Sequence, residues 1–376
     1  MLELLNIKIE VEKLSNILGK AEDCLDLQYL TARIQYLDQV IAQPDFWNHP
    51  TRAYEVLQEI EYSIFYKHQE YQRWCSILED IKAALELLEL SADEQLWQEV
   101  QSNLTQLQQE LETAEIQQLL SDPHDQKGAF LTITAGVGGV DAEYWAYTLL
   151  RLYHSWVVSH NYLVDIVEES YGDEAGIKSV TLEIIGRYAY GLLKSEQGTH
   201  RVIRVSPFSS NSKLHTCLAS VEVSPILDES VDFEIPEKDL EITWPRYQGN
   251  VNRTETWVKM VHIPTGISVF CNQQRSLMQN KEKALAILKS KLFAIALAQD
   301  VQIDKIQPRQ IKPLSNKLIR EYILHPYTKV KDLRTNVETT AATEVLDGKI
   351  DFFIKAYLQQ LNYTTSVGKE ELDNFK

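Results

Sequence analysis

The chain has 376 residues, enough for two or three domains, and a formal net charge of -17 at pH 7. Its 44% hydrophobic and 24% charged residues are typical of a globular protein. No apolar run reaches the roughly 18 residues that a membrane-spanning helix needs, which argues against a membrane protein. The first residues resemble neither a signal peptide nor a transit peptide, so an organellar protein would need a targeting segment outside this sequence.

The cysteines indicate a reducing compartment. Cys24, Cys75, Cys217 and Cys271 lie far apart and form no CxxC pair. We interpret them as reduced thiols in the core. No His or acidic residues stand beside them at the short spacing of a metal site, so we expect neither a metal nor a cofactor.

Charge is distributed unevenly along the chain. Residues 1–125 hold about 24 acidic against about 8 basic residues, whereas residues 241–334 hold about 16 basic against about 7 acidic ones. This asymmetry suits a protein that contacts RNA with one face only. An unevenly charged, solvated surface explains it equally well.

The first 120 residues have the pattern of long helices. Apolar residues recur at helical spacing over residues 25–41, and Pro44 and Pro50 predict a break after them. Two long amphipathic stretches follow, at residues 53–90 and 92–120, with almost no Gly or Pro. Such a run predicts an antiparallel bundle or coiled coil. Its acidic surface suits a protein partner better than RNA.

A polar linker at residues 121–125 separates these helices from a segment of mixed α and β structure. Alternation predicts a first strand at residues 130–134, and an aromatic-rich helix is expected at 142–160. Further strands are expected at residues 162–168, 179–184, 220–223, 231–235, 257–262 and 267–271. A basic helix is expected at 280–299 and another helix at 350–361, so the fold class is multidomain α+β.

A glycine-rich loop at residues 135–141 joins the first strand to the aromatic-rich helix. Such a loop at a helix start is able to bind phosphate, but neither GxxxxGK[ST] nor GxGxxG is present. We therefore expect a tight turn in which Asp141 caps the helix.

A basic strand that carries Arg201 and Arg204 leads into a Ser206-Pro207-Phe208 turn, and His215-Thr216 follow a polar stretch. Exposed aromatic and imidazole rings stack on unpaired bases, and small hydroxyls bond base edges. The alternative is an ordinary turn in which Phe208 fills the core. Neither here nor elsewhere does a Ser-His-Asp set or a suitably spaced acid pair indicate a hydrolase.

Together these motifs resemble the class I peptide chain release factors of the bacterial type, release factor 2 class. Ser206-Pro207-Phe208 resembles the tripeptide type that reads UGA and UAA. The resemblance covers roughly residues 25–362 and is carried by further segments in the same order: 45–47, 135–139, 175–179, 188–191, 198–201, 215–216, 325–327, 331–335 and 345–348.

The resemblance implies a domain plan and a binding surface. It implies a helical bundle at 1–123, a codon-recognition domain at 124–237 and 308–363, a peptidyl-tRNA hydrolysis domain at 238–307 and a flexible tail at 364–376. Members of the family enter the ribosomal A site, where a Gly-Gly-Gln loop promotes attack of water on the peptidyl-tRNA ester. The codon- or RNA-binding residues it implies are Arg201, Arg204, Ser206, Pro207, Phe208, His215 and Thr216.

The sequence departs from the family at the catalytic loop. The family pattern is Arg-Thr-Ser-Gly-Ala-Gly-Gly-Gln, but about four residues are missing here and no Gly-Gly-Gln remains. The degenerate loop contains Arg246, Gln248, Gly249, Asn250 and Arg253. Removing one oxyanion donor typically costs about 10²–10³ in rate, so the shortened loop predicts that the chain is not an enzyme. A milder departure is Leu214, which stands where the family carries a cation.

Three functions remain open. The first is an RNA-binding protein without hydrolase activity, which binds mRNA or ribosomal RNA and stabilises a chloroplast mRNA. The second is a ribosome-binding termination factor that reads UGA and UAA but is defective in peptide release or depends on a partner for it. Hydrolysis through Gln248 is a third reading. The resemblance places the protein in the chloroplast stroma, with a bacterial cytoplasm as the alternative, and no small-molecule substrate is expected.

Overall fold

The computed structural model describes residues 2–25, 33, 36–37, 39–42, 46, 66–90, 93–120, 122, 124–172, 174–208, 213–227, 235–245, 256–299 and 317–361. The chain divides into two compact units, residues 1–115 and 116–376. The finer domain boundaries at residues 123, 237, 307 and 363 stay predictions.

The first unit is helical, as its apolar periodicity predicts. It contains α1 (Leu2–Leu25), α4 (Tyr66–Leu90) and most of α5 (Glu94–Leu119). Residues three and four apart on each helix lie on one face, and these faces bury a shared core that includes Leu14, Ile81 and Leu107. The predicted break at Pro44 and Pro50 lies outside the described residues.

The second unit is built on an eight-stranded sheet with the order β11-β10-β9-β4-β5-β1-β3-β2. Neighbouring strands are antiparallel except β4 and β9, which are parallel. The strands are β1 (Ala129–Ala135), β2 (Leu163–Tyr171), β3 (Ile177–Ile185), β4 (Gly198–Val205), β5 (Leu214–Pro225), β9 (Leu318–Ile323), β10 (Lys329–Asp332) and β11 (Glu338–Thr339).

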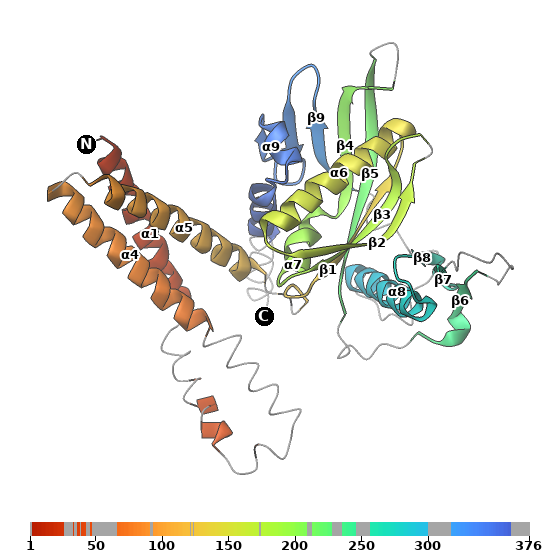
Figure 1. Cartoon of the computed structure of the whole chain (residues 1–376), viewed down its shortest axis with the longest axis horizontal. Coiled ribbons are helices and arrows are strands. Elements are labelled where there is room, and N and C mark those ends of the chain that lie inside the picture. Colours follow the sequence, from red (N-terminus) through yellow and green to blue (C-terminus); the bar gives the residue numbers. More distant parts are fainter. Residues whose placement is uncertain are drawn as a thin grey trace, which may run out of the picture. The chain divides into compact units, whose positions relative to one another are not determined.

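Helices cover one face of this sheet. The long helix α6 (Val140–Ser159) crosses it (Figure 1). The side chains of Trp145, Tyr153 and Trp156 on this helix are fully buried. The short helices α7 (Ala189–Leu193) and α9 (Ala342–Leu346) and the helical residues 351–361 contribute to the same core. Aromatic side chains of this size bury large apolar areas, which explains why the aromatic-rich segment forms the central helix.

A smaller layer packs near the opposite face of the sheet. It consists of a three-stranded antiparallel sheet, β6 (Leu240–Thr243), β7 (Val258–His262) and β8 (Ile267–Cys271), and the helix α8 (Leu277–Gln299). Its core is shared with Phe130 of β1 and Val167 of β2. Lys283 of α8 also pairs with Glu183 of β3. The predicted strand at 231–235 lies almost entirely outside the described residues.

The predicted α+β fold class is thus confirmed. Cys217 and Cys271 are buried free thiols and Cys75 is partly buried, while the side chain of Cys24 lies outside the described residues. Among the described helices, none combines the length and the hydropathy needed to cross a membrane. The described side chains also include no group of three or more His, Cys, Asp or Glu that is arranged to bind a metal ion.

A buried polar network joins the C-terminal strands to β4. Arg320 of β9 donates two hydrogen bonds of 2.6 Å to the Glu196 carboxylate, and all of these side-chain atoms are shielded from solvent. Asp332 of β10 accepts hydrogen bonds from Arg320 and from Arg334. A buried charge is tolerated only when it is paired and hydrogen-bonded, so this network fixes how β9 and β10 pack beside β4.

His200 of the Gly198-Thr199-His200-Arg201 motif belongs to this network rather than to a surface. Its ring accepts or donates hydrogen bonds within the core, with Nε2 3.0 Å from the Glu196 carbonyl oxygen. The side chain is fully buried, and burial lowers the pKa of His200 from 6.5 to about 4, with nearby Arg320 acting in the same direction.

We expect His200 to make stability fall as the pH falls. The unfolded chain protonates His200 below pH of about 6.5, whereas the folded chain keeps it neutral down to about pH 4. Between these values the unfolded state binds more protons, so acid favours unfolding by about 2 kcal/mol at pH 5 relative to pH 7. Chemical denaturation at both pH values checks this. The His200→Gln variant should lose less stability between them, and an unchanged pH dependence would contradict the prediction.

Candidate functional site

The start of α6 is fixed against β5 by the glycine-rich loop. The Gly136 N–H donates to the Leu218 carbonyl at 2.8 Å, and the Leu218 N–H donates to the Val137 carbonyl at 3.0 Å. Gly138 has a φ of 140°, and a Cβ at this position would lie 3.0 Å from the Cys217 sulfur. Only glycine satisfies both constraints, so this loop serves close helix–strand packing.

Asp141 is not the helix cap that its position in the sequence predicts. Gly139 is the N-cap of α6 and makes no side-chain capping hydrogen bond. Asp141 lies within the first turn instead, with 5% of its surface exposed. Its carboxylate points across to β4 and β5, because three groups there provide hydrogen-bond donors and positive charge.

The Asp141 carboxylate gathers three of the predicted site residues. Ser206 Oγ donates to it at 2.6 Å, an Arg204 guanidinium nitrogen lies 3.2 Å away, and His215 Nδ1 lies 3.1 Å away. Arg204 and His215 are partners across the β4–β5 ladder, so both side chains leave the sheet on the α6 side. The positive end of the α6 dipole also favours a carboxylate at this position.

Ser206 and Phe208 form one small turn. The Phe208 N–H donates to Ser206 Oγ at 3.1 Å, while Ser206 itself is 3% exposed. The Phe208 side chain is 45% exposed, so it does not fill the core. Its ring meets the Tyr144 ring edge-on at 5.7 Å, and the Arg204 guanidinium lies over Tyr144 at 4.5 Å. An exposed ring is thus held in one place by polar and aromatic neighbours.

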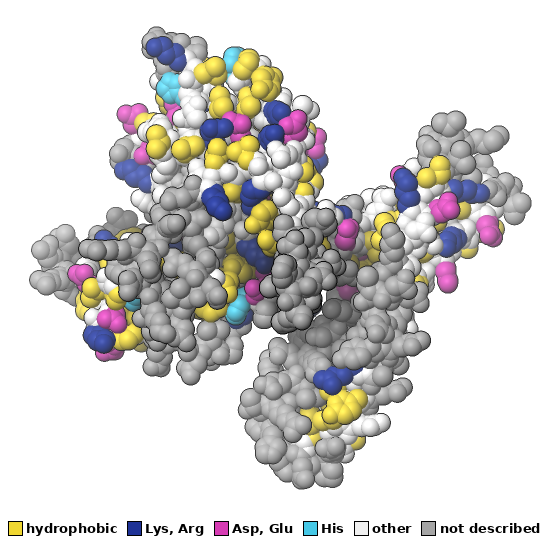
Figure 2. All heavy atoms as spheres, turned by 180° about the vertical axis from the view of Figure 1, so that it is seen from behind, with side chains coloured by type: hydrophobic (Ala, Val, Ile, Leu, Met, Phe, Trp, Pro, Cys, Tyr) yellow, Lys and Arg dark blue, Asp and Glu magenta, His cyan; other side chains and the backbone are white. Residues whose placement is uncertain are grey.

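The remaining predicted residues are placed differently. Pro207 is exposed beside Phe208. Arg201 and Thr216 alternate with inward-facing residues, which puts them on the sheet face opposite α6. Arg201 pairs there with Glu321 of β9 at 2.6 Å, on a face where Lys and Arg side chains lie among hydrophobic ones (Figure 2). Residues 209–212, which connect the two strands, lie outside the described residues.

Sequence reasoning missed two members of this cluster. Asp141 was expected only as a cap, and Tyr144 was not singled out. A signal for Asp141 was available, because Arg204 and His215 share a strand-pair face and need a buried anion opposite them. Tyr144 follows Asp141 by three residues, so it occupies the same helix face. The cluster formed by Asp141, Tyr144, Arg204, Ser206, Phe208 and His215 is called the Asp141 cluster below.

The predicted degenerate loop residues Arg246, Gln248, Gly249, Asn250 and Arg253 lie outside the described residues. The stem that follows the loop is well anchored. The buried Asn280 accepts from the Gln274 N–H at 2.9 Å and donates to the carbonyls of Gln274 and Thr256. Thr256 in turn donates to the Gln274 carbonyl at 2.8 Å. The scaffold that carries the loop is therefore rigid at this end.

Comparison with known proteins identifies the family. Residues 30–221 match the PCRF domain and residues 229–334 match the RF-1 domain. The chain is 40% identical to peptide chain release factor PrfB1, chloroplastic, of Arabidopsis thaliana over 375 residues, covering 98% of this chain and 82% of that protein. It is 37% identical to peptide chain release factor 2 of Listeria innocua over 368 residues, covering 95% and 99%.

The chain belongs to the class I release factor 2 family. The structure agrees with this assignment. It superposes on release factor 2 of Thermus thermophilus with a TM-score of 0.65 and 30% sequence identity, covering 91% of this chain and 98% of that one. The expected resemblance to release factors is thus confirmed.

Family membership corrects one prediction. The expectation that the chain is not an enzyme is wrong, because its relatives are peptide chain release factors, which catalyse peptidyl-tRNA hydrolysis on the ribosome. The prediction rested on the sequence of the loop alone. That loop lies outside the described residues, and nothing in the described part of the release factor fold shows a loss of activity. A shorter sequence does not by itself determine where a loop tip reaches.

Proposed function

We propose that this release factor 2 family member is a translation termination factor that enters the ribosomal A site and reads UGA and UAA codons with the Asp141 cluster. The observation that carries the proposal is that Ser206 and His215 both contact the Asp141 carboxylate at the end of the β4–β5 pair, while the Phe208 N–H donates to that same Ser206 hydroxyl. RNA and the ribosome are then its partners, and no cofactor takes part.

The cluster provides the groups that reading a base requires. The buried Ser206 Oγ donates to Asp141 and accepts from the Phe208 N–H, so this hydroxyl fixes the turn that presents Phe208. His215 turns Nδ1 toward Asp141, so its other nitrogen remains for RNA. Phe208 offers an exposed ring, and aromatic rings stack on unpaired bases. Each group is held before RNA arrives, which reduces the entropy lost on binding.

Peptide release is proposed to be slow or to depend on a partner. The loop between β6 and β7 would carry the water-orienting residues, and the sequence has no Gly-Gly-Gln there. Glycines adopt backbone angles that other residues disfavour, which lets a backbone N–H face a developing oxyanion. A loop with fewer residues and fewer glycines is expected to position that donor less well.

A second candidate function is the binding and stabilisation of an mRNA in the chloroplast stroma. The altered loop favours it, because a surface that binds single-stranded RNA remains useful without a fast release step. The 40% identity to a chloroplastic protein supports the location. The acidic helical unit would then remain available for a protein partner, since acidic residues outnumber basic ones there.

Ribosome co-sedimentation separates the two functions. A termination factor should pellet with ribosomes programmed with UGA or UAA and remain in solution with a sense codon. An mRNA-stabilising protein should instead shift a labelled transcript in a gel without ribosomes, and its affinity should fall as the salt concentration rises. Binding to neither sample would contradict both functions.

Replacing Asp141 should weaken codon-dependent binding. In the Asp141→Ala variant, Ser206, Arg204 and His215 lose their shared acceptor, and an unsatisfied buried group costs about 1–3 kcal/mol. We expect affinity for UGA-programmed ribosomes to fall about 5- to 150-fold. The matched control is Glu143→Ala, which removes another acid from the first turn of α6. Equal losses in the two variants would contradict the role of the Asp141 cluster.

A further inference from the structure

A row of aromatic rings leads from the Asp141 cluster along α6. The Tyr144 ring centroid lies 5.7 Å from that of Phe208 and 6.5 Å from that of Tyr147. Tyr144 and Tyr147 are three residues apart and therefore share one helix face. Tyr147 is 42% exposed, close to the value for Phe208, whereas Tyr144 is partly buried between them. The row thus presents two exposed rings joined by a third.

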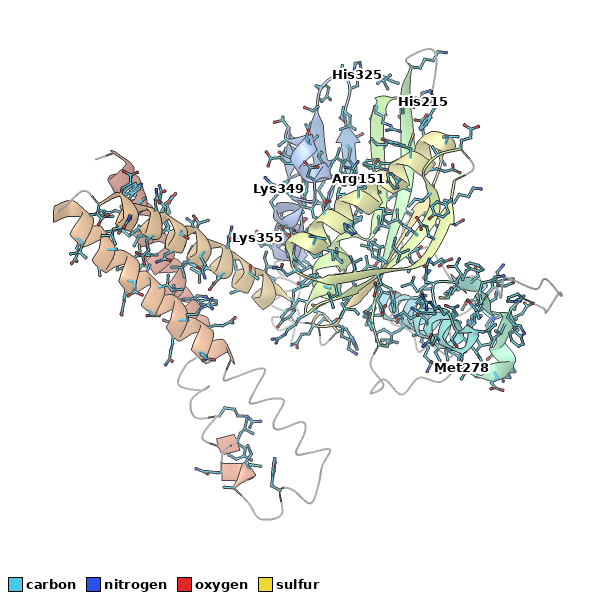
Figure 3. The ribbon with its side chains drawn as sticks, viewed as in Figure 1. Arg151, His215, Met278, His325, Lys349 and Lys355 are labelled. Carbon is cyan, nitrogen blue, oxygen red and sulfur yellow. The ribbon has the colours of Figure 1, made fainter. Side chains whose placement is uncertain are left out.

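Positive charge accompanies this row. Arg204 lies over the ring of Tyr144, the middle member of the row. Arg151 follows Tyr147 by four residues, so it occupies the same face one turn further on. Its side chain is exposed, and no described carboxylate forms an ion pair with it. Arg151 and His215 lie on the side of the sheet that α6 covers (Figure 3).

We propose that Tyr147 and Arg151 extend the codon-reading surface and bind the unpaired nucleotide that follows the stop codon. The base stacks on the Tyr147 ring and its phosphate pairs with Arg151. This inference rests on the proposed function, because the Asp141 cluster is what brings RNA to Phe208. Neither residue belongs to the cluster, and neither contributes to the core.

The chemistry of the row selects single-stranded RNA as its occupant. Exposed aromatic rings beside an unpaired arginine are the usual surface for unpaired bases and their phosphates. A protein partner would favour an apolar centre with charges at the rim, but here the Arg204 guanidinium lies over the central ring of the row. Nucleotides upstream of the stop codon are paired with peptidyl-tRNA. The neighbour of the codon that is free to stack on this row is therefore the downstream nucleotide.

The test compares two programmed ribosomes and four forms of the full chain. One mRNA ends at the third base of UGA, and the other continues for six adenosines. Downstream adenosines should tighten binding of the wild-type chain at least about 5-fold, the effect of one stacking ring. Tyr147→Ala should abolish this gain and Tyr147→Phe should retain it. The matched control is Tyr171→Ala, which removes a 70% exposed tyrosine from β2 and should leave the gain unchanged.

The outcomes distinguish this inference from the proposed function. If wild type and Tyr147→Ala gain equally from the downstream adenosines, the inference is overturned while codon reading stands. If the chain binds UGA and sense codons alike, codon reading fails, and the row is tested on labelled single-stranded hexa-adenosine without ribosomes. There, a loss of about 5-fold or more in Tyr147→Ala supports RNA binding by the row, and an unchanged affinity overturns it.

Discussion

Inserting Gly-Gly-Gln after Gly249 should raise the rate of peptide release on UGA-programmed ribosomes by at least about 10³-fold. One oxyanion donor contributes about 10²–10³ in rate, and correct positioning contributes further. The end of the loop is already anchored for the insertion, because Asn280 forms hydrogen bonds with the backbone of Thr256 and Gln274. Release of a labelled formyl-methionine from programmed ribosomes measures the rate directly.

The control insertion has the same length without the chemistry. Three alanines after Gly249 lengthen the loop by the same amount but supply neither the glycine backbone angles nor the glutamine. If the alanine insertion accelerates release as much as Gly-Gly-Gln does, loop length alone limits the reaction. If neither insertion accelerates release while both variants still bind, the proposal that the loop limits the rate of release is contradicted.

Replacing Arg320 should cost about 3–5 kcal/mol of folding stability. Arg320 is fully buried, and its two 2.6 Å hydrogen bonds neutralise Glu196 in the core. The Arg320→Ala variant leaves that carboxylate buried without its partner, which is the most damaging way to break a buried ion pair. It also removes the guanidinium that lies 4.3 Å from the Phe353 ring centroid. Chemical denaturation gives the change in the free energy of unfolding.

Two further variants show whether the unpaired charge is the cause. Adding Glu196→Gln to Arg320→Ala removes that charge, so the double variant should recover part of the lost stability. Lys349→Ala breaks an ion pair whose side chains are 72% and 59% exposed, and it should change stability by less than about 0.5 kcal/mol. A double variant that is less stable than Arg320→Ala would contradict the claim that the unpaired Glu196 charge causes the loss of stability.

Local sequence patterns predicted the elements of the fold better than its connections. Alternation in residues 130–134 and the aromatic periodicity of residues 142–160 correspond to β1 and α6. The parallel pairing of β9 with β4 could not be predicted, because the two strands are more than 110 residues apart in sequence and no local pattern encodes that pairing. The buried network of Arg320, Glu196 and Asp332 was not predicted either, because charged residues usually lie on the protein surface.

The sequence predicted some residues of the candidate site and misplaced or missed others. Ser206, Phe208 and His215 were predicted from residue type and order, and the structure brings them together. Arg201 was grouped with them because it is basic and near in sequence, but strand alternation turns it to the other face. Asp141 was missed because its partners lie on strands that come more than 60 residues later. The roles of all these residues in RNA binding stay predictions.

The most direct test of codon reading compares how long the purified chain stays bound to ribosomes with different codons in the A site. We predict slow dissociation from UGA and UAA complexes and fast dissociation from UAG and sense-codon complexes, with the difference reduced in Asp141→Ala. Dissociation at one common rate from all four complexes would contradict the account.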